Sequence, residues 1–347
     1  MLTRRPLPEP RRTERPGGAR FTLSTRDLPD EAAGRKLLAA RLLAVPASIA
    51  PRYFYDAAGC ALFAAICELP EYYPTRTEAA IFADRRREIA AAVGTGKQLV
   101  DLGAGDCAKA EGWMHWLAPR RYVAVDVAAP ELERALERVA AAHPAIEVAG
   151  VVTDFARSLE AGRGLDLTRD LDDGAVIFFY PGSSIGNFVP ADAVRFLRAI
   201  HAQCRARRGV SGSGLLIGVD TVKDNARLHA AYDDAAGVTA AFNRNILKHV
   251  NRVLGTRFDP AAFEHVAVYD AEQGRIEMHL EARKAQTVSI EGIARRFEAG
   301  ERILTEYSYK YHPSTFTAML TAAGFGDVRC WQDERGDFAV YFASAVG

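Results

Sequence analysis

A glycine-rich loop lies between a short apolar segment and a helical pattern, in residues 100–108. Gly103 and Gly105 carry no Cβ, so the backbone can turn sharply there and approach a bound molecule closely. Asp126 ends the next apolar segment, about 20 residues further along, where a carboxylate can accept hydrogen bonds from both hydroxyls of a ribose. These residue types in this order predict a nucleotide-binding site.

Two classes of nucleotide-binding enzyme share this spacing: dehydrogenases that bind a dinucleotide, and class I methyltransferases that bind S-adenosylmethionine. Asp154 and Phe155 follow the third apolar segment, where a carboxylate can accept from an adenine amino group and a ring can cover the base. Residues 327–333 and 338–344 predict an antiparallel hairpin, which suits the sheet of a class I methyltransferase. A dehydrogenase also needs a hydride-handling residue, and the sequence indicates none. We therefore favour the methyltransferase interpretation.

The elements that must position these residues begin with an alternation of apolar segments and helical patterns from residue 98 onward. Largely apolar strands are typical of a parallel sheet with helices on both faces, so the pattern predicts a doubly wound α/β fold. After Asp220 the alternation stops. We expect strands at 98–103, 121–127, 147–155, 175–182 and 214–220, helices over 222–255, and two strands over 263–288.

The N-terminal part of the chain has a different pattern. Residues 1–20 contain six Arg and four Pro, and we expect a disordered basic tail. Residues 31–68 are mostly helical in pattern. Thr75 and Glu78 have the spacing of a capping box, which predicts a helix that begins there and runs to about Val93.

The composition disfavours several classes of protein. The 347 residues include 44 Lys+Arg and 44 Asp+Glu, and this balance argues against a nucleic-acid partner, which requires a basic face. Five scattered cysteines without a C-x-x-C pair predict reduced thiols in the cytoplasm, and no Cys/His cluster has the spacing of a metal site. No apolar run is long enough for a membrane-spanning helix, so we expect no membrane partner.

Several motifs, in order along the chain, resemble those of the histidine-specific Nα-methyltransferase family, whose members make the histidine betaine hercynine for ergothioneine biosynthesis. The resemblance extends from about residue 25 to the C-terminus. Its motifs are Tyr53–Asp56, Glu71–Glu78, Gly182–Asn187, Asp220–Asp224, Tyr232–Thr239, Phe242–Asn245, Phe263–Ala267 and Thr305–Ser308. It implies three successive methyl transfers from S-adenosylmethionine to L-histidine, with S-adenosylhomocysteine as the product of each.

The resemblance also implies an architecture. The class I methyltransferase sheet, which is Rossmann-like, would be accompanied by a second, α+β substrate-binding domain built from two chain segments. Residues 21–75 and 221–304 would form the substrate-binding domain, and residues 76–220 and 305–347 the methyltransferase domain.

The resemblance implies roles for residues at the substrate. Tyr72 and Asn187 would be the catalytic residues beside the substrate α-amino group, and Tyr232 would contact the substrate carboxylate. Glu306 and Ser308 would hold the imidazole. They are two apart on an expected strand, so both side chains face the same side. Met278 would border the same pocket.

The resemblance also implies roles at the cofactor. Lys109 matches a lysine that can reach the methionine carboxylate, and Tyr55 matches a tyrosine that borders the cofactor. The other expected cofactor residues are those of the loop and strand ends: Gly103, Gly105, Asp126, Asp154 and Phe155.

Other interpretations of the same residues stay open at this point. Tyr72 would also suit a packing wedge, Asn187 a cap for the next helix, Glu306 a solvent-facing charge, and Met278 a core residue. The other functions that we consider are Nα-methylation of another amino acid and a binding protein without catalysis. In each case we expect a monomer that binds a small amino acid.

Overall fold

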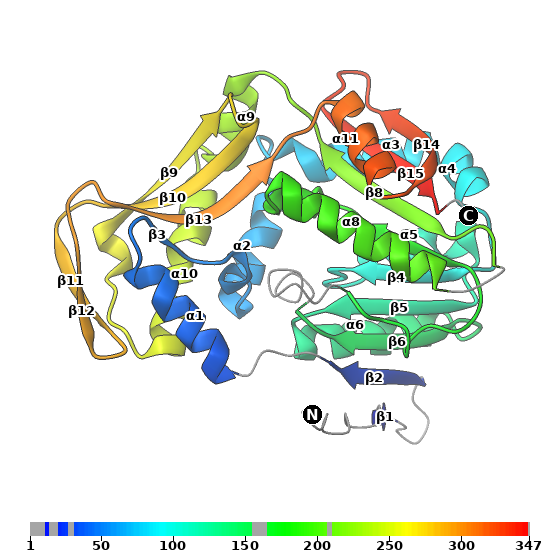
Figure 1. Ribbon diagram of the computed structural model, residues 1–347, viewed down its shortest axis with the longest axis horizontal. Helices are drawn as coiled ribbons and strands as arrows, with labels where there is room; N and C mark the ends of the chain where they lie inside the picture. The colour runs from blue at the N-terminus through cyan, green and yellow to red at the C-terminus, as the bar shows by residue number, and fades with distance from the viewer. Residues whose placement is uncertain (1–10, 14–19, 27–30, 155–164, 207–209, 346–347) are drawn as a thin grey trace.

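The computed structural model describes residues 11–13, 20–26, 31–154, 165–206 and 210–345 (Figure 1). Two sheets with separate hydrophobic cores divide the described chain into a larger and a smaller part, as Figure 1 shows. None of the helices in these ranges is long and apolar enough to cross a lipid bilayer. The larger part contains the expected nucleotide-binding loop, and the smaller part packs beside it.

Within the described ranges, the large sheet contains nine strands, six of them in parallel register. The order is β1 (Arg11–Thr13), β2 (Phe21–Thr25), β6 (Glu147–Val152), β5 (Arg121–Asp126), β4 (Gln98–Leu102), β7 (Val176–Tyr180), β8 (Gly214–Asp220), β15 (Phe338–Ser344) and β14 (Gly326–Gln332). The strand order reverses between β4 and β7, and ligands bind at such a reversal, outside the carboxyl ends of the strands. The expected C-terminal hairpin is confirmed, because β15 pairs antiparallel with both β8 and β14.

Helices cover both faces of this sheet, as the apolar strands predicted. Val100 and Leu102 of β4 face a core that includes residues of α8 (Pro190–Arg205) and α11 (Pro313–Ala322). Leu99 lies on the opposite face. There the core includes residues of α3 (Tyr73–Asp84), α4 (Arg86–Val93), α5 (Ala108–Leu117) and α6 (Ala129–Ala142). The doubly wound α/β fold is confirmed.

The smaller part is built on a four-stranded sheet whose order is β3-β13-β10-β9. Its strands are β3 (Ala47–Ser48), β13 (Arg302–Tyr309), β10 (Arg275–Ala282) and β9 (Phe263–Asp270). Side chains of β10 alternate between buried and half-buried, the pattern of a sheet with one covered face. The helices that pack with it are α1 (Glu31–Leu43), α2 (Ala57–Glu68), α9 (Asn225–Tyr232) and α10 (Val238–Leu254). A separate hairpin joins β11 (Gln286–Ile290) to β12 (Ile293–Phe297).

Two chain segments that are far apart in the sequence pack together in this smaller core. The 3₁₀ helix η1 (Pro51–Phe54) places Phe54 against Phe242 of α10, with ring centroids 4.5 Å apart. β3 pairs in parallel with β13, so residues 47–48 lie beside residues 303–304. A substrate-binding part made from two chain segments was expected, and these contacts join the two segments.

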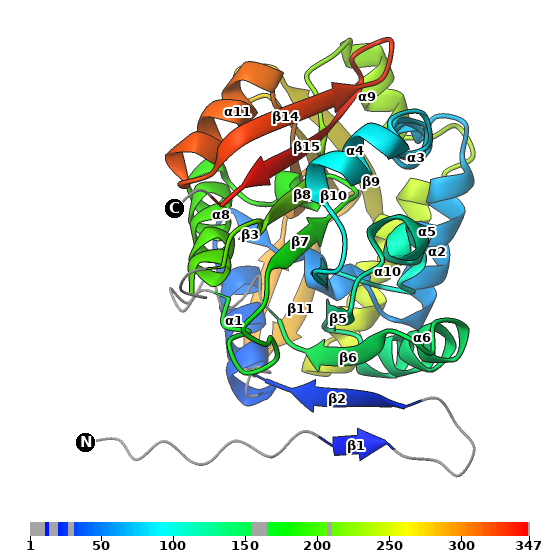
Figure 2. The ribbon, with the colours of Figure 1, turned by 90° about the vertical axis from the view of Figure 1, so that its right-hand side faces the viewer.

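Three expected boundaries are wrong. The strand β2 belongs to the large sheet, where it pairs with β6, whereas residues 21–25 were assigned to the substrate-binding domain. The strand β13 lies in the small sheet, although residues 305–309 were assigned to the methyltransferase domain. Within the expected disordered tail, Arg11–Thr13 pair with β2 as the strand β1, seen at one end of the sheet in Figure 2. Hydrogen-bond partners far along the chain determine these positions, and a local pattern does not contain them.

Candidate active site

A pocket of about 640 Å³, counting its open mouth, lies between the two sheets. It is reached from the carboxyl ends of β7 and β8, where Gly182 and Asp220 contribute to its wall. The expected substrate residues all line it, together with Tyr55: Tyr72, Asn187, Tyr232, Met278, Glu306 and Ser308. Its mixture of aromatic and polar side chains suits a small polar molecule such as an amino acid.

Asn187 is positioned by the short 3₁₀ helix η2 (Ser184–Asn187), which follows β7. Gly182 and Ser183 both have positive φ, 78° and 58°, so the chain turns sharply as it leaves the strand. The Ser183 hydroxyl accepts from the backbone N–H of Asp220 at 2.8 Å, which ties the turn to β8. The next helix, α8, has Val189 at its N-cap, so the alternative role of Asn187 as the cap of that helix is wrong.

Tyr72 stands just before α3 and forms part of an aromatic wall. Its ring centroid lies 6.4 Å from that of Tyr232 and 6.2 Å from that of Phe63, in edge-to-face arrangements. Burial raises the pKa of Tyr72 well above its usual value. The phenol therefore stays neutral, and its hydroxyl can donate or accept a hydrogen bond.

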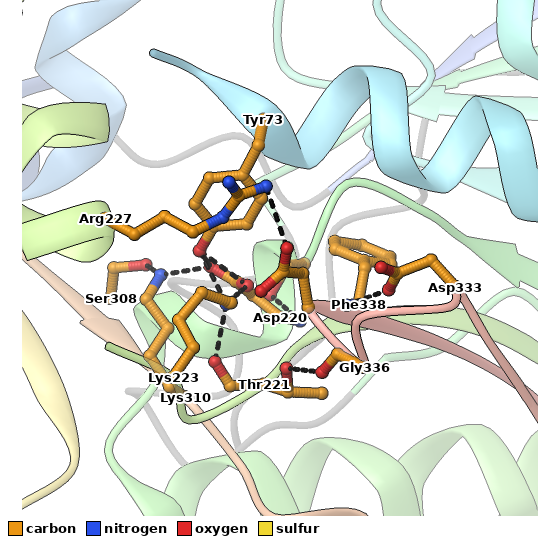
Figure 3. A network of polar contacts seen from close by, with 12 residues as sticks. Tyr73, Asp220, Thr221, Lys223, Arg227, Ser308, Lys310, Asp333, Gly336 and Phe338 are labelled. Atoms are coloured by element: carbon orange, nitrogen blue, oxygen red, sulfur yellow. Dashed lines mark hydrogen bonds and ion pairs between the residues drawn. The ribbon is translucent and has the colours of Figure 1, made fainter. Parts of the chain in front are cut away.

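The side chains of Tyr232 and Ser308 are hydrogen-bonded to each other, although the family resemblance implied that they contact different ends of the substrate. Their hydroxyl oxygens are 2.7 Å apart. The ammonium of Lys310 donates to both, at 2.8 Å to Tyr232 and 2.7 Å to Ser308. Figure 3 shows Lys310 and Ser308 in the polar network that leads on to Asp220 and Tyr73.

Glu306 and Met278 are cross-strand neighbours, because they pair in the register of β13 with β10. Burial raises the pKa of Glu306 to about 7, and the nearby charge of Lys310 opposes that rise. A carboxyl group that titrates near neutral pH is able to accept a hydrogen bond from an imidazole N–H. The alternative role of Glu306 as a solvent-facing charge is wrong, because its side chain lines the pocket.

The glycine loop lies at the carboxyl end of the central strand β4, between β4 and α5. Gly103 and Gly105 both have positive φ, 70° and 53°, and no atom lies within 4 Å of the place where either would carry a Cβ. The backbone N–H of Gly105 donates to Asp126 at 2.9 Å, and the other carboxylate oxygen of Asp126 accepts from Ala128. The loop therefore has open space beside it and a carboxylate at its rim.

Lys109 pairs with Glu78, and this pairing overturns the expected capping box. The helix α3 begins at Tyr73, two residues before Thr75, so Glu78 does not lie in a capping position. The buried Glu78 carboxylate instead accepts from Lys109 at 2.7 Å and from the backbone N–H of Gly182 at 2.7 Å. It links α3 and α5 to the turn that holds Asn187.

Asp154 is paired with Arg52 of η1 at 2.9 Å, so a residue of the smaller part reaches the expected adenine position. Phe155 lies outside the described residues. Tyr55 lines the pocket and remains 38% exposed. Arg52 has no counterpart in the expectations from sequence.

Sequence reasoning missed four buried residues near the pocket. They are Tyr73, Glu78, Asp220 and Lys310. Lys310 follows Glu306 and Ser308 at the same two-residue interval, which is the one local signal that would have identified it. The role of Asp220 depends on partners far along the chain.

A family described as "Histidine-specific methyltransferase, SAM-dependent" matches residues 35–345, which include the pocket and the glycine loop. The chain belongs to this family. S-adenosylmethionine is accordingly its cofactor, and the open glycine loop with Asp126 at its rim fits a nucleoside there.

Two similar proteins of this methyltransferase family come from mycobacteria. The histidine N-alpha-methyltransferase of Mycolicibacterium smegmatis is 43% identical over 315 residues, which are 89% of this chain and 94% of that protein. The protein of the same name from Mycobacterium tuberculosis is 40% identical over 306 residues, 86% of this chain and 91% of that protein. Ergothioneine biosynthesis protein 1 of Neurospora crassa is 29% identical over 82% of this methyltransferase and 32% of its own length.

Proposed function

We propose that this methyltransferase transfers three methyl groups in succession to the α-amino nitrogen of L-histidine. The product would be Nα,Nα,Nα-trimethyl-L-histidine (hercynine), and the reaction the first step of ergothioneine biosynthesis. The names of the mycobacterial and Neurospora relatives support this substrate and this pathway. The observation that carries the proposal is the placement of Glu306, Ser308 and Asn187 around one pocket.

The chemical step requires an uncharged amine held in line with the methyl group. S-adenosylmethionine supplies an electrophilic methyl carbon on a sulfonium. The nitrogen lone pair forms the new N–C bond, and the electrons of the broken C–S bond remain on sulfur. We propose that the amide oxygen of Asn187 accepts from the amine N–H in the first two transfers and thereby aims the lone pair. The dimethylated amine has no N–H, so the walls of the pocket would hold it for the third transfer. The amine proton would leave through water or the neutral Tyr72 hydroxyl.

Repeated methylation creates a quaternary cation that cannot donate hydrogen bonds. The pocket offers it the aromatic side chains of Tyr72, Phe63 and Phe242. Aromatic faces attract quaternary ammonium groups through the negative potential above the ring. This wall supports the proposal that the pocket retains the substrate through the later transfers.

Substrate selection would depend on Glu306 and Ser308, as acceptor and hydroxyl partner for the two ring nitrogens. A pocket that hydrogen-bonds a polar ring rejects analogues that leave its polar groups unpaired. Phenylalanine offers no ring N–H, and tryptophan offers one where a protonated histidine ring offers two. We therefore expect histidine to be preferred over both.

The cofactor roles stay proposals that follow from position. Asp126 would accept from the ribose and Asp154 from the adenine, with Arg52 as the group that now pairs with Asp154. Lys109 would reach the methionine carboxylate from its contact with Glu78. We also propose a monomer. The five cysteines are free, which supports a reducing compartment such as the cytoplasm.

The test is incubation of the purified protein with S-adenosylmethionine and each of histidine, tryptophan, tyrosine and phenylalanine. Mass spectrometry should detect singly, doubly and triply methylated histidine. Asn187→Ala should lower turnover about 100-fold, because the amine loses its alignment, while calorimetry shows unchanged affinity for S-adenosylhomocysteine. Methylation of tryptophan but not histidine would overturn the substrate assignment. Binding without any methylated product would overturn the enzymatic one.

A further inference from the structure

Three polar residues follow one another at alternate positions along β13 and the residue after it: Glu306, Ser308 and Lys310. The side chain of Lys310 has no exposed surface. Burying an ammonium is costly unless acceptors replace the lost water. The position of Lys310 beside the pocket therefore requires an explanation from its partners.

Lys310 has three acceptors, one for each hydrogen of its ammonium group. It pairs with Asp220 at 2.8 Å and donates to the hydroxyl of Ser308 (Figure 3). It also donates to the hydroxyl of Tyr232. Asp220 raises the pKa of Lys310 against the effect of burial, so the ammonium keeps its charge. The geometry is that of a fully hydrogen-bonded cation.

Asp220 is shared between two lysines. Lys223 also donates to Asp220, and the hydroxyl of Tyr73 donates to both carboxylate oxygens at 2.9 Å. Two ammonium groups and one carboxylate leave one positive charge in this cluster when both lysines are protonated. Burial lowers the pKa of Lys223 to about 8, which still leaves it mostly protonated at neutral pH. Asp220 is therefore held beside Lys310 by a second ammonium group and by the Tyr73 hydroxyl.

A count of hydrogens shows what the two hydroxyls offer a ligand. Each hydroxyl carries one hydrogen, and Lys310 already occupies an acceptor position on each oxygen. The 2.7 Å contact between Tyr232 and Ser308 uses one of the two hydrogens. The second hydrogen is left for a partner outside these three groups. Both hydroxyl residues line the pocket, so a ligand there meets a donor.

Tyr232 is the better donor to an anion, because a phenol is more acidic than an alcohol. Burial raises the pKa of Tyr232, with Lys310 in opposition, so the phenol keeps the proton that it donates. Ser308 then donates to the phenol oxygen, and the Tyr232 hydrogen is free to bind a carboxylate. A hydrogen bond to a charged acceptor is stronger than one between neutral groups.

We propose that Lys310 is a positioning residue for the amino-acid substrate: by donating to Tyr232 and Ser308, it turns the Tyr232 hydroxyl toward the substrate carboxylate. Asp220 anchors Lys310 in this role. The inference rests on the proposed function, since it assumes an amino acid in the pocket. It adds a group that acts on the substrate carboxylate through the Tyr232 hydroxyl.

The first experiment measures binding by calorimetry in the presence of saturating S-adenosylhomocysteine. The ligands are L-histidine and histamine, which lacks only the carboxylate. Lys310→Met should weaken L-histidine binding about 10- to 100-fold, the effect of losing a charge-supported hydrogen bond. It should weaken histamine binding clearly less, and it should change S-adenosylhomocysteine binding by no more than about twofold. Equal losses for L-histidine and histamine, or no loss for either, would overturn the proposal.

A double-mutant cycle separates this role from simple support of the fold. Tyr232→Phe should weaken L-histidine binding, and adding Lys310→Met to it should cost little more, because Lys310 acts through that hydroxyl. Full additivity of the two losses would contradict the proposal. Lys223→Met is the matched control, because Lys223 contacts the other oxygen of Asp220. It should lower thermal stability but keep the preference for L-histidine over histamine.

A second variant and a second ligand pair are available if the first experiment fails. If Lys310→Met does not fold, Lys310→Gln, which keeps an N–H donor for one partner, takes its place in the same comparison. If the unmodified protein binds no L-histidine, the proposed function fails on its own. The inference is then tested with the amino acid that does bind and its decarboxylated amine.

Discussion

Glu306 brings a carboxyl group into a pocket whose walls are largely aromatic. Burial raises its pKa to about 7, while the charge of Lys310, four residues further along the chain, opposes that rise. Free imidazole titrates in the same range, near about 6.5. A histidine ring and Glu306 are thus able to share a proton near neutral pH. The similar pKa values of Glu306 and of imidazole make the pocket suitable for an imidazole ring, in addition to the negative charge of the carboxylate.

The raised pKa of Glu306 has a consequence for stability. Its ordinary pKa is 4.5, so between about pH 4.5 and 7 the folded protein binds the proton more tightly than the unfolded chain does. The free energy of unfolding of the unmodified protein should therefore fall as the pH rises through this window. The fall is measured against Glu306→Gln, which cannot ionise, by urea unfolding at a series of pH values. Parallel curves for the two proteins would contradict the raised pKa.

The turn η2 holds Asn187 because it packs closely on β13. A Cβ on Gly186 would lie 2.7 Å from the carbonyl oxygen of Tyr309, which is closer than real contacts allow. The residue at this position must therefore be glycine for η2 to reach its place. The amide of Asn187 and the residues that follow Glu306 are set at a fixed distance by this backbone contact.

Gly186→Ala should push η2 away from β13 and move Asn187 out of alignment. We expect a loss of about 1–3 kcal/mol in the free energy of unfolding, typical of overpacking, and a lower turnover number. Urea unfolding and steady-state kinetics provide the two measurements.

The matched control is Gly112→Ala in α5, where no atom lies within 4 Å of the added Cβ. That exposed helical position should tolerate alanine or gain about 0.5–1 kcal/mol. If the two alanine variants were equally stable and active, the close packing of η2 on β13 would not position the site.

The two cores meet at the pocket and at a small number of charged contacts. Arg52 of η1 reaches Asp154 after β6, and Arg227 of α9 reaches Asp337 before β15, at 2.9 and 2.8 Å. The chain itself crosses between the parts repeatedly, since β2, β3, β4 and β9 alternate between the two sheets. A ligand at this junction therefore contacts both parts, and its binding should stabilise the molecule as a unit.

S-adenosylhomocysteine at 100 times its dissociation constant should add about 2.7 kcal/mol to the free energy of unfolding, because it binds only the folded state. Thermal unfolding with and without the ligand measures this gain. Asp126→Ala should abolish most of it at the same ligand concentration, since the ribose loses its acceptor. Asp173→Ala is the control, an exposed carboxylate just before β7 at the other end of the strands. An equal gain in Asp126→Ala would exclude the ribose role.

Local patterns predicted what local interactions determine. The five strands from Gln98 to Asp220 and the hairpin at β14 and β15 were predictable, because apolar runs and turn residues lie within each segment. Glu78 was misassigned, because its partners Lys109 and Gly182 are 31 and 104 residues away. The expected substrate residues meet in one pocket. They were predicted from the motifs of the family, and composition alone would not have identified them.

The way the chain enters and leaves the small sheet bears on how such a protein arises. It leaves the large sheet after Thr221 and returns at Tyr311, and these two residues form a parallel bridge with each other. A segment whose ends meet can be gained or exchanged in a gene without breaking the strand pairing of its host. Part of the pocket therefore lies in a chain segment that is separate from the segment with the glycine loop. Exchange of residues 222–310 between relatives would transfer four of the six expected substrate residues, Tyr232, Met278, Glu306 and Ser308, and leave the glycine loop untouched.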